Sequence, residues 1–307
     1  MILILIKLLI LPLLSPLCIG IIRKIDAFMQ NRRGASVIQP YFDLWKLFHK
    51  DEVISPDASW IFRATPYIIF AISLMLPLGI PLLSQVESWG FFSDFLVVVY
   101  LLALMTFFLA LAGIDTGSMF GGFGASREMT LSALTEAVLV FSLLPIAIIS
   151  QTSNLILMAT TTSSLPPITY FPIFIAFIGF FIALMAETGR IPFDNPSTHL
   201  ELTMIHEAMI IEYSGKRLAL IEWTAANKFL FFVLLGANIF FPYGLSTTTN
   251  LLDLLIAVGV VAMKALLLIG AIGIIESSIA KYRLFRLPDL LLTGLILGII
   301  SLIATNI

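Results

Sequence analysis

Apolar runs long enough to form membrane-spanning helices recur along the whole chain, and this feature restricts its possible folds more than any other. About 20 apolar residues in a helix cross a hydrocarbon core of roughly 30 Å. Within a bilayer, only helices and closed barrels satisfy their own backbone hydrogen bonds. The sequence therefore predicts an all-α integral membrane protein, a single polytopic domain over residues 1–307. Eight spans are expected, near residues 2–22, 62–83, 94–114, 130–150, 169–187, 226–245, 252–275 and 287–306.

Composition supports this class. Charged residues make up 12% of the chain, whereas soluble proteins have roughly a quarter. The first run is not a signal peptide, because the basic residues Arg23 and Lys24 follow it instead of preceding it. The net charge of −2 gives no reason to expect a nucleic-acid partner. A single cysteine, Cys18, cannot hold an iron-sulfur cluster, so any electron carriers are expected in partner proteins.

The basic residues are strongly segregated. If the loops alternate between two sides, fifteen of the 17 lysines and arginines fall on one side and none on the other. By the positive-inside rule, the protein lies in the cell membrane with both termini outside, and the loops after the first, third, fifth and seventh spans are cytoplasmic. The remaining two, Lys7 and Lys264, lie within spans. Lys7 is close to the outer end and is expected to snorkel to the surface.

Several other ionisable residues are predicted at membrane depth. Glu136, Lys264 and Glu276 lie within spans, and Glu187 lies at the end of one. A charged group at a helix centre costs roughly 2.5 to 3.5 kcal/mol, so these groups are expected to face protein or water and to find partners. A chain of such groups could form a proton path. Pairwise locking of the helix bundle would explain them equally well.

The first cytoplasmic loop combines paired arginines with an amphipathic pattern. Arg32 and Arg33 could bind anionic lipid head groups, or they could form a docking shelf together with Asp43. Apolar residues further along the loop are spaced as in a helix that lies along the membrane surface. These are Tyr41, Leu44, Trp45, Leu47 and Phe48.

A second cytoplasmic loop is rich in glycine over residues 121–124. It does not match a phosphate-binding motif, because neither GxxxxGK[ST] nor GxGxxG is complete. We expect a tight loop that lets the backbone approach a neighbouring segment. Arg127 and Glu128 would then lie at the beginning of the fourth span.

Residues 187–217 form the longest polar stretch and the strongest candidate for chemistry, with five acidic residues and two of the three histidines. His206-Glu207 begins like a zinc-protease motif, but Ile210 stands where its second histidine would be.

A helix over residues 198–212 would have two polar faces. His199 and His206 would project together, and Glu201 and Glu212 would share another face. Neither spacing suits two ligands of one metal, so no metal site is predicted. A helix of this kind could line a polar cavity whose groups titrate. A solvated loop is the alternative.

Two signatures together resemble a known family, the membrane subunit shared by respiratory complex I, where it is subunit 1, and the group 4 nickel-iron hydrogenases. The resemblance covers nearly the whole chain. It rests on residues 32–34, Gln39, Asp43, Lys46, 191–194 and 212–215.

Within that family the chain is more similar to the hydrogenase branch, represented by formate hydrogenlyase subunit 4 and hydrogenase-4 component C. This similarity lies in residues 55–63, 115–118 and 124–128. After Pro-Phe-Asp the family usually has closely spaced glutamates. In this chain only Glu201 matches one of them. That departure favours hydrogenase chemistry over quinone chemistry.

The resemblance implies a subunit without a redox centre that anchors a hydrogenase and couples it to proton or sodium movement. Its partners would be the hydrogenase large and small subunits, an iron-sulfur protein and antiporter-like membrane subunits, and the nickel-iron site and iron-sulfur clusters would lie in those partners. Two alternatives are a quinone-site subunit of a complex I-like dehydrogenase and a stand-alone secondary transporter. The lack of an internal repeat disfavours the transporter.

The ion-coupling candidates are Glu128, Glu136, Glu187, Asp194, Glu201, Glu207, Glu212, Lys264 and Glu276. The candidates for docking the redox arm are Arg32, Arg33, Gln39, Asp43, Lys46, Arg127, His199, His206 and Tyr213.

Overall fold

The computed structural model describes residues 2–83, 90–166, 170–194, 204–246 and 250–305. Within these residues, eight helices are long and apolar enough to cross a membrane, which confirms the predicted all-α membrane fold. They are α1 (Ile2–Met29), α3 (Trp60–Met75), α4 (Phe95–Asp115), α5 (Met119–Ser150), α7 (Tyr170–Glu187), α9 (Gly215–Ile239), α10 (Leu251–Ser278) and α11 (Leu287–Ala304). The shorter elements are α2 (Gln39–Phe48), α6 (Leu155–Ser163), α8 (His206–Ile210) and the 3-10 turns η1 (Leu76–Leu78) and η3 (Leu284–Arg286).

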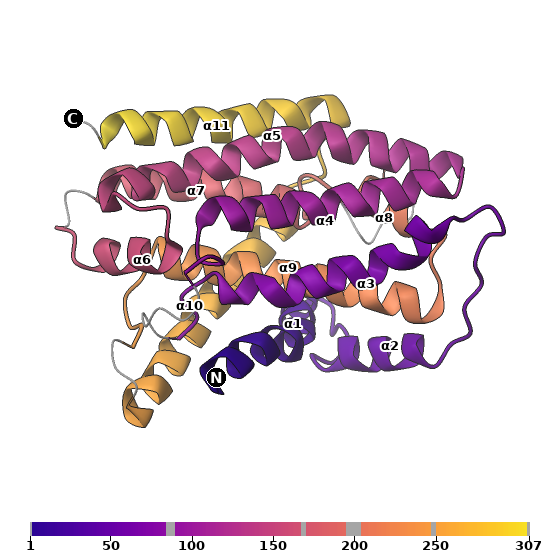
Figure 1. The fold of residues 1–307 in the computed structure, drawn as a ribbon, viewed down its shortest axis with the longest axis horizontal. Coiled ribbons are helices and arrows are strands. Elements are labelled where there is room, and N and C mark those ends of the chain that lie inside the picture. The colour runs from indigo at the N-terminus through magenta and orange to yellow at the C-terminus, as the bar shows by residue number, and fades with distance from the viewer. Residues whose placement is uncertain (1, 84–89, 167–169, 195–203, 247–249, 306–307) are drawn as a thin grey trace.

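The long helices lie side by side, and their connections gather at two ends of the bundle (Figure 1). One end carries α2, α8 and the turn between α4 and α5, and we call it the polar end. The opposite half carries α6 and both chain termini (Figure 1). All five ion pairs among the described residues lie toward the polar end. The charge segregation of the sequence is thus a segregation between the two ends of the bundle.

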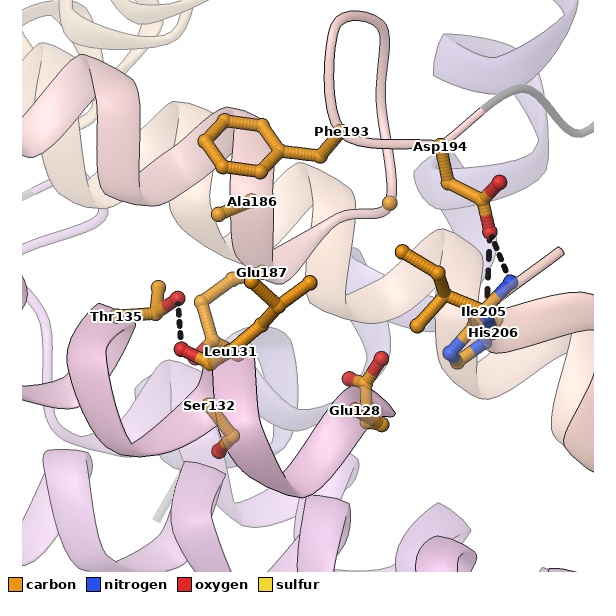
Figure 2. A pocket seen from close by; sticks show the side chains of 11 residues that line it. Glu128, Leu131, Ser132, Thr135, Ala186, Glu187, Phe193, Asp194, Ile205 and His206 are labelled. Carbon is orange, nitrogen blue, oxygen red and sulfur yellow. Dashed lines mark hydrogen bonds between the residues drawn. The ribbon is translucent and has the colours of Figure 1, made fainter. Parts of the chain in front are cut away.

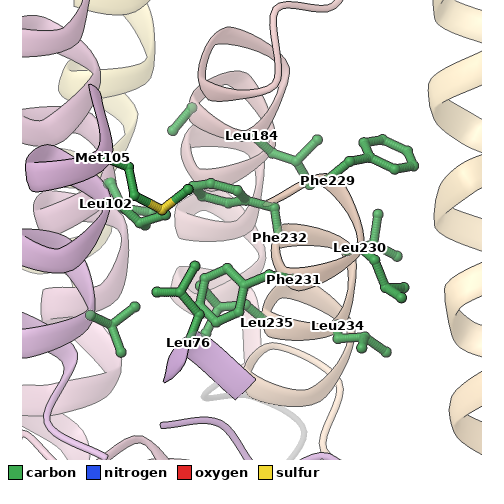
Figure 3. Packing of buried hydrophobic residues seen from close by; sticks show 14 of the residues in the cluster. Leu76, Leu102, Met105, Leu184, Phe229, Leu230, Phe231, Phe232, Leu234 and Leu235 are labelled. Carbon is green, nitrogen blue, oxygen red and sulfur yellow. The ribbon is translucent and has the colours of Figure 1, made fainter. Parts of the chain in front are cut away.

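Helix α9 is at the centre of the bundle. Its most apolar window is 72% buried, against 28% for both α10 and α11. Three phenylalanines of α9, Phe229, Phe231 and Phe232, are fully buried. They pack among side chains of α4 and α7, including Met105 and Leu184 (Figure 3). This helix therefore supplies the rigid wall against which the other elements are positioned.

Helix α5 begins at Met119, about three turns earlier than expected. The glycine stretch is helical, so the predicted loop is wrong, but the predicted close approach is present. A Cβ on Gly121 would lie 2.1 Å from the carbonyl oxygen of Gly113 in α4. The missing side chain lets the two helix backbones touch, which offsets the low helix propensity of glycine. With 32 residues, α5 is about 48 Å long and extends beyond a hydrocarbon core of roughly 30 Å.

One further boundary and one side-chain position differ from expectation. Helix α9 begins at Gly215 rather than near residue 226, because its first turns carry charged residues that interrupt the apolar pattern. Lys7 does not snorkel, since only 3% of the residue is exposed and its ammonium donates to the carbonyl of Ile80 at 3.3 Å. The predicted surface helix is present as α2, and its Phe42 and Trp45 are 56% and 67% exposed.

Candidate functional site

A partly open pocket, which we call the acidic cavity, lies where α5, the end of α7, the segment 188–194 and the beginning of α8 meet (Figure 2). It offers about 20 Å³ to water centres, enough for roughly one or two water molecules. It is lined by Glu128, Leu131, Ser132, Thr135, Ala186, Glu187, Gly189, Phe193, Asp194, Ile205 and His206.

Close packing of α8 on α5 forms one side of this cavity. A Cβ on Gly124 of α5 would lie 2.8 Å from the carbonyl oxygen of Ile205 and 2.9 Å from the Cβ of Ala208. Only glycine permits this approach. Because α8 rests directly on α5, its first residue, His206, reaches the cavity that Glu128 enters from α5 (Figure 2).

Glu187 ends α7 and is paired with a lysine from the central helix. Its carboxylate lies 2.6 Å from the Lys228 ammonium, and the two side chains are only 5% and 13% exposed. The charge count grouped Lys228 with the cytoplasmic loops, although it falls at the edge of the predicted span 226–245; because α9 begins at Gly215, Lys228 lies well inside the helix. A lysine within an apolar run was the signal that could have identified it.

Asp194 ties three segments together. Its Oδ1 lies 2.6 Å from the Lys281 ammonium, which follows α10. Its Oδ2 accepts hydrogen bonds from the backbone N–H groups of Ile205 at 3.0 Å and His206 at 3.1 Å (Figure 2). The side chain therefore fixes the beginning of α8 and one wall of the cavity.

Among the described residues, the carboxyl groups that line the cavity outnumber the ammonium groups that pair with them. Glu128, Glu187 and Asp194 supply three carboxyl groups, and Lys228 and Lys281 supply two ammonium groups. Within the described part of the chain, Glu128 forms neither an ion pair nor a hydrogen bond with a protein group. A carboxylate that is half-buried without a partner is costly, so Glu128 is the carboxyl group of this cavity whose charge is least compensated by the described residues.

Two adjacent residues of α8 have opposite pKa shifts. Burial, together with the nearby Lys228 ammonium and against the pull of Asp194, lowers the pKa of His206 to about 4. Burial also raises the pKa of Glu207 to about 7; the carboxylates of Glu222 and Asp194 add to this effect and Arg23 opposes it. At neutral pH, His206 is therefore a neutral imidazole and Glu207 exchanges a proton readily.

The groups that act on Glu207 belong to two different cavities. Asp194 lines the first cavity, whereas Arg23 and Glu222 line a second one between α1, α2 and α9. Glu207 thus lies within electrostatic reach of both. Glu222 was not among the predicted site residues, because it lies in the part of α9 that was expected to be a loop. The second cavity is lined by Pro16, Ile19, Arg23, Pro40, Asp43, Leu44, Leu47, Glu222 and Ala226.

The other ion-coupling candidates are distributed along the bundle. Glu136 lies one turn further along α5 than Ser132, whose hydroxyl donates to it at 3.0 Å. Glu276 pairs with Arg190 at 3.5 Å on the other side of the segment 188–194. The Lys264 ammonium hydrogen-bonds to oxygen atoms at the end of α9, far along the chain from the acidic cavity.

The expected two-faced helix is only partly observed. His199 and Glu201 lie outside the described residues. Helix α8 has five residues and ends at Ile210, so the exposed Glu212 belongs to the following turn and not to the helix of His206. The chain changes direction between α8 and α9. Gly215, the first residue of α9, has a φ of 55°, which glycine adopts readily.

The docking candidates fall into exposed and internal groups. Arg32, Arg33 and Lys46 are exposed at the polar end. Asp43 is linked to Gln39 at 2.9 Å and to Arg23 at 3.7 Å.

Arg127 and Tyr213 have internal roles in the described structure. Arg127 donates to the carbonyl of Met204 at 3.0 Å. Tyr213 is only 4% exposed; it stacks on Phe62 with ring centroids 3.9 Å apart and donates to the Phe62 carbonyl at 2.9 Å. Tyr213 therefore orders the polar end from within and offers little surface to a partner.

Among the described residues, no group of three or more histidine, cysteine or acidic side chains is arranged to hold a metal ion. The cavity is lined by titratable groups of the chain itself, which are Glu128, Glu187, Asp194 and His206. They can bind, hold and release protons.

Comparisons with known proteins identify relatives along the whole chain. A family model described as NADH dehydrogenase matches residues 1–306. Hydrogenase-4 component C of Escherichia coli (strain K12) is 36% identical over 276 residues, which cover 89% of this chain and 86% of that protein. Formate hydrogenlyase subunit 4 of the same organism is 32% identical over 304 residues, 98% of each chain. A subunit of the NADH-quinone oxidoreductase of Rickettsia prowazekii (strain Madrid E) is 29% identical over 205 residues, 64% of this chain and 60% of that protein.

A similar fold occurs in a solved structure, that of the membrane-bound sulfane sulfur reductase (MBS), an archaeal respiratory membrane complex. The TM-score is 0.86, with 98% of each chain covered and 20% sequence identity. This comparison supports the fold alone.

Proposed function

The chain belongs to the NADH dehydrogenase family, and on that premise we propose that it is the membrane-anchor and ion-coupling subunit of an energy-converting hydrogenase of the formate hydrogenlyase type. In this role it holds a redox arm at the membrane and links electron transfer in that arm to the movement of protons or sodium ions. The relatives that support the hydrogenase branch are 36% and 32% identical and extend over most of the chain.

The unequal charges in the acidic cavity are the observation that carries this proposal. Three carboxyl groups face two ammonium groups in a confined space at the polar end of the bundle. Among the described residues, one added proton balances these charges, and Glu128 is the group best placed to carry it. A change in the redox arm that moves α8 would alter the distance from Glu128 to its neighbours, and with it the affinity for that proton.

The remaining candidates extend this path. Glu136 lies one turn beyond Ser132, and Glu207 lies within electrostatic reach of both cavities. Lys264 lies deeper in the bundle, where it contacts the end of α9. Glu276 pairs with Arg190 of the segment 188–194. Glu212 is exposed in the turn after α8, where it would face the redox arm, and Glu201 is proposed for the same role from its position in the sequence.

The polar end is the proposed docking face for the arm. The fifteen segregated basic residues favour a cytoplasmic location for this end, with both termini on the other side of the cell membrane. Arg32, Arg33 and Lys46 are exposed there. The partners would be hydrogenase large and small subunits, an iron-sulfur protein and antiporter-like membrane subunits, which would hold the nickel-iron site and the iron-sulfur clusters.

The coupling role is tested with the assembled complex in sealed vesicles, by measuring hydrogen evolution and ion uptake in parallel. Glu128→Gln should lower the number of ions moved per hydrogen formed, because glutamine cannot carry the proton. Asp289→Asn is the matched control, since Asp289 is exposed in the first turn of α11 and lines neither cavity. An unchanged ratio in the Glu128 variant would refute the assignment.

Anchoring is tested by deleting the chain from the producing cell. Hydrogenase activity should then move from the membrane fraction to the soluble fraction, and activity that stays with the membrane would contradict the anchoring role. Sensitivity of the purified complex to quinone analogues would instead identify a quinone-reducing member of the family.

A further inference from the structure

A second group of ionisable side chains lies on the other side of the segment 188–194. It consists of Asp26 near the end of α1, Arg190, and Glu276 and Ser277 near the end of α10. The Arg190 guanidinium lies 3.5 Å from the Glu276 carboxylate, and these side chains are 12% and 6% exposed. The same guanidinium stacks on the Phe229 ring at 4.6 Å. Arg190 is thus held in a buried position by the central helix.

A close contact between α1 and α10 brings Asp26 to this group. A Cβ on Gly273 would lie 2.8 Å from a methyl carbon of Ile25 and 3.5 Å from Oδ1 of Asp26. Gly273 precedes Glu276 by three residues and therefore lies on the same face of α10. The Asp26 carboxyl accordingly packs against α10 one turn before Glu276, within electrostatic reach of both Glu276 and Arg190.

Two atoms of this group are buried without a hydrogen-bond partner among the described residues. They are Oδ1 of Asp26 and Oγ of Ser277. The Ser277 hydroxyl lies beside the Asp26 carboxyl but does not form a hydrogen bond of normal geometry with it. Buried polar atoms are almost always paired, so two neighbouring exceptions call for a physical explanation.

Charge balance supplies that explanation. Asp26 and Glu276 face one guanidinium, so ionisation of both would leave one uncompensated negative charge at a half-buried carboxyl group whose Oδ1 is enclosed. Asp26 also lies in the last turn of α1, where the helix dipole disfavours a carboxylate. A protonated Asp26 removes both penalties and gains an O–H donor beside Ser277.

We propose that Asp26 and Glu276 form a second proton-carrying pair, in which Arg190 neutralises Glu276 and Asp26 holds the proton. This inference rests on the proposed ion-coupling function and extends it to a residue outside the acidic cavity. The segment 188–194 joins the two sites, because it carries both Arg190 and Asp194. When this segment moves, Arg190 shifts relative to the pair; the pair then binds a second proton or gives one up, and only O–H bonds are made or broken.

The presence of the proton is tested by infrared difference spectroscopy on the purified complex. At neutral pH, the C=O stretching band of a protonated carboxylic acid should be lost in Asp26→Asn and retained in Asp289→Asn. Identical bands in the parent and the Asp26 variant would overturn the proposal, whatever the ion-pumping result.

The coupling role of Asp26 is tested in sealed vesicles beside the Glu128 variant. Asp26→Asn should retain hydrogen evolution and lose most of the ion movement per hydrogen formed, and Asp26→Glu should restore it. A purely structural role would lower the stability and the hydrogen evolution together. If Glu128→Gln loses coupling and Asp26→Asn keeps it, only the second pair is refuted; if both keep it, the proposed function falls as well.

Discussion

The ammonium of Lys281 lies 2.6 Å from the carboxylate of Asp194, although the two residues belong to segments that flank different membrane helices. Because Asp194 also accepts two backbone hydrogen bonds at the beginning of α8, this ion pair connects the α10–α11 connection to the acidic cavity. The position of the α10–α11 connection and the beginning of α8 therefore both depend on Asp194.

Removing either partner should therefore destabilise the protein. We expect Asp194→Ala or Lys281→Met to lower the free energy of unfolding by about 2 to 4 kcal/mol, because each removes one half of a largely buried ion pair. The double variant should lose less than the sum of the single losses. Unfolding in mild detergent, followed as a double-mutant cycle, measures this coupling, and strictly additive losses would contradict it.

The contact between α4 and α5 supplies a test with a close control. Gly121→Ala would place a methyl group 2.1 Å from the Gly113 carbonyl oxygen, and overpacking of this kind costs about 1 to 3 kcal/mol or more. Gly122 is the matched control, since a Cβ there has nothing within 4 Å. Gly122→Ala should be neutral or stabilising by up to about 1 kcal/mol. Equal thermal stability of the two variants would refute the close approach.

Much of the fold could be predicted from the sequence. The eight spans follow from apolar run length, and the segregation of basic residues correctly placed the loops at one end. The beginnings of α5 and α9 could not be found this way, because both helices start in stretches that are not uniformly apolar. Whether Gly121 is helical depends on what α4 places beside it, and this information is absent from the local sequence.

The candidate site could be predicted only in part. The polar stretch pointed to Glu187, Asp194 and His206, which the structure brings together around one cavity. Their cationic partners lie far away in sequence, at Lys228 and Lys281, and only tertiary packing brings them within 2.6 Å.

Asp26 was missed for a related reason. Near the end of the first span it resembles an ordinary interfacial residue. Its burial depends on Gly273 allowing α1 and α10 to touch.

The opposite pKa shifts of His206 and Glu207 predict a pH signature in the single variants. The pKa of His206 falls from 6.5 to about 4 on folding, so its contribution to stability is lost as the pH falls from about 6.5 to about 4. The pKa of Glu207 rises from 4.5 to about 7, so its contribution is lost as the pH rises from about 4.5 to about 7. In the parent protein, the two contributions change the stability in opposite directions as the pH varies between about 4 and 7.

Each substitution removes one contribution, so the pH dependence of stability that the other residue causes should become measurable. We expect Glu207→Gln to be less stable at pH 4 than at pH 6.5, and His206→Gln to be less stable at pH 7 than at pH 4.5. Because both residues are only half-buried, the change across each range should be about 1 to 2 kcal/mol. Denaturation midpoints in detergent at stepped pH values measure it. Parallel pH profiles for the two variants would contradict the assigned shifts.

Lys264 provides a last test, because its partners are neutral oxygen atoms at the end of the central helix. Its ammonium lies 2.9 Å from both Oδ1 of Asn238 and the carbonyl oxygen of Phe241, and 3.3 Å from the carbonyl oxygen of Ala237. The last carbonyl groups of a helix lack intrahelical donors, and a cation there is favoured by the helix dipole.

Replacing this lysine should release the end of α9. Lys264→Met should lower the free energy of unfolding by about 1 to 3 kcal/mol, because a buried side-chain oxygen and two carbonyl groups lose their donor. Leu267→Met is the control on the same helix, since that side chain is 67% exposed and makes no polar contact. Hydrogen exchange at the amides just after Ile239 should accelerate in the Lys264 variant alone. Equal exchange in both variants would mean that the ammonium does not hold the helix end.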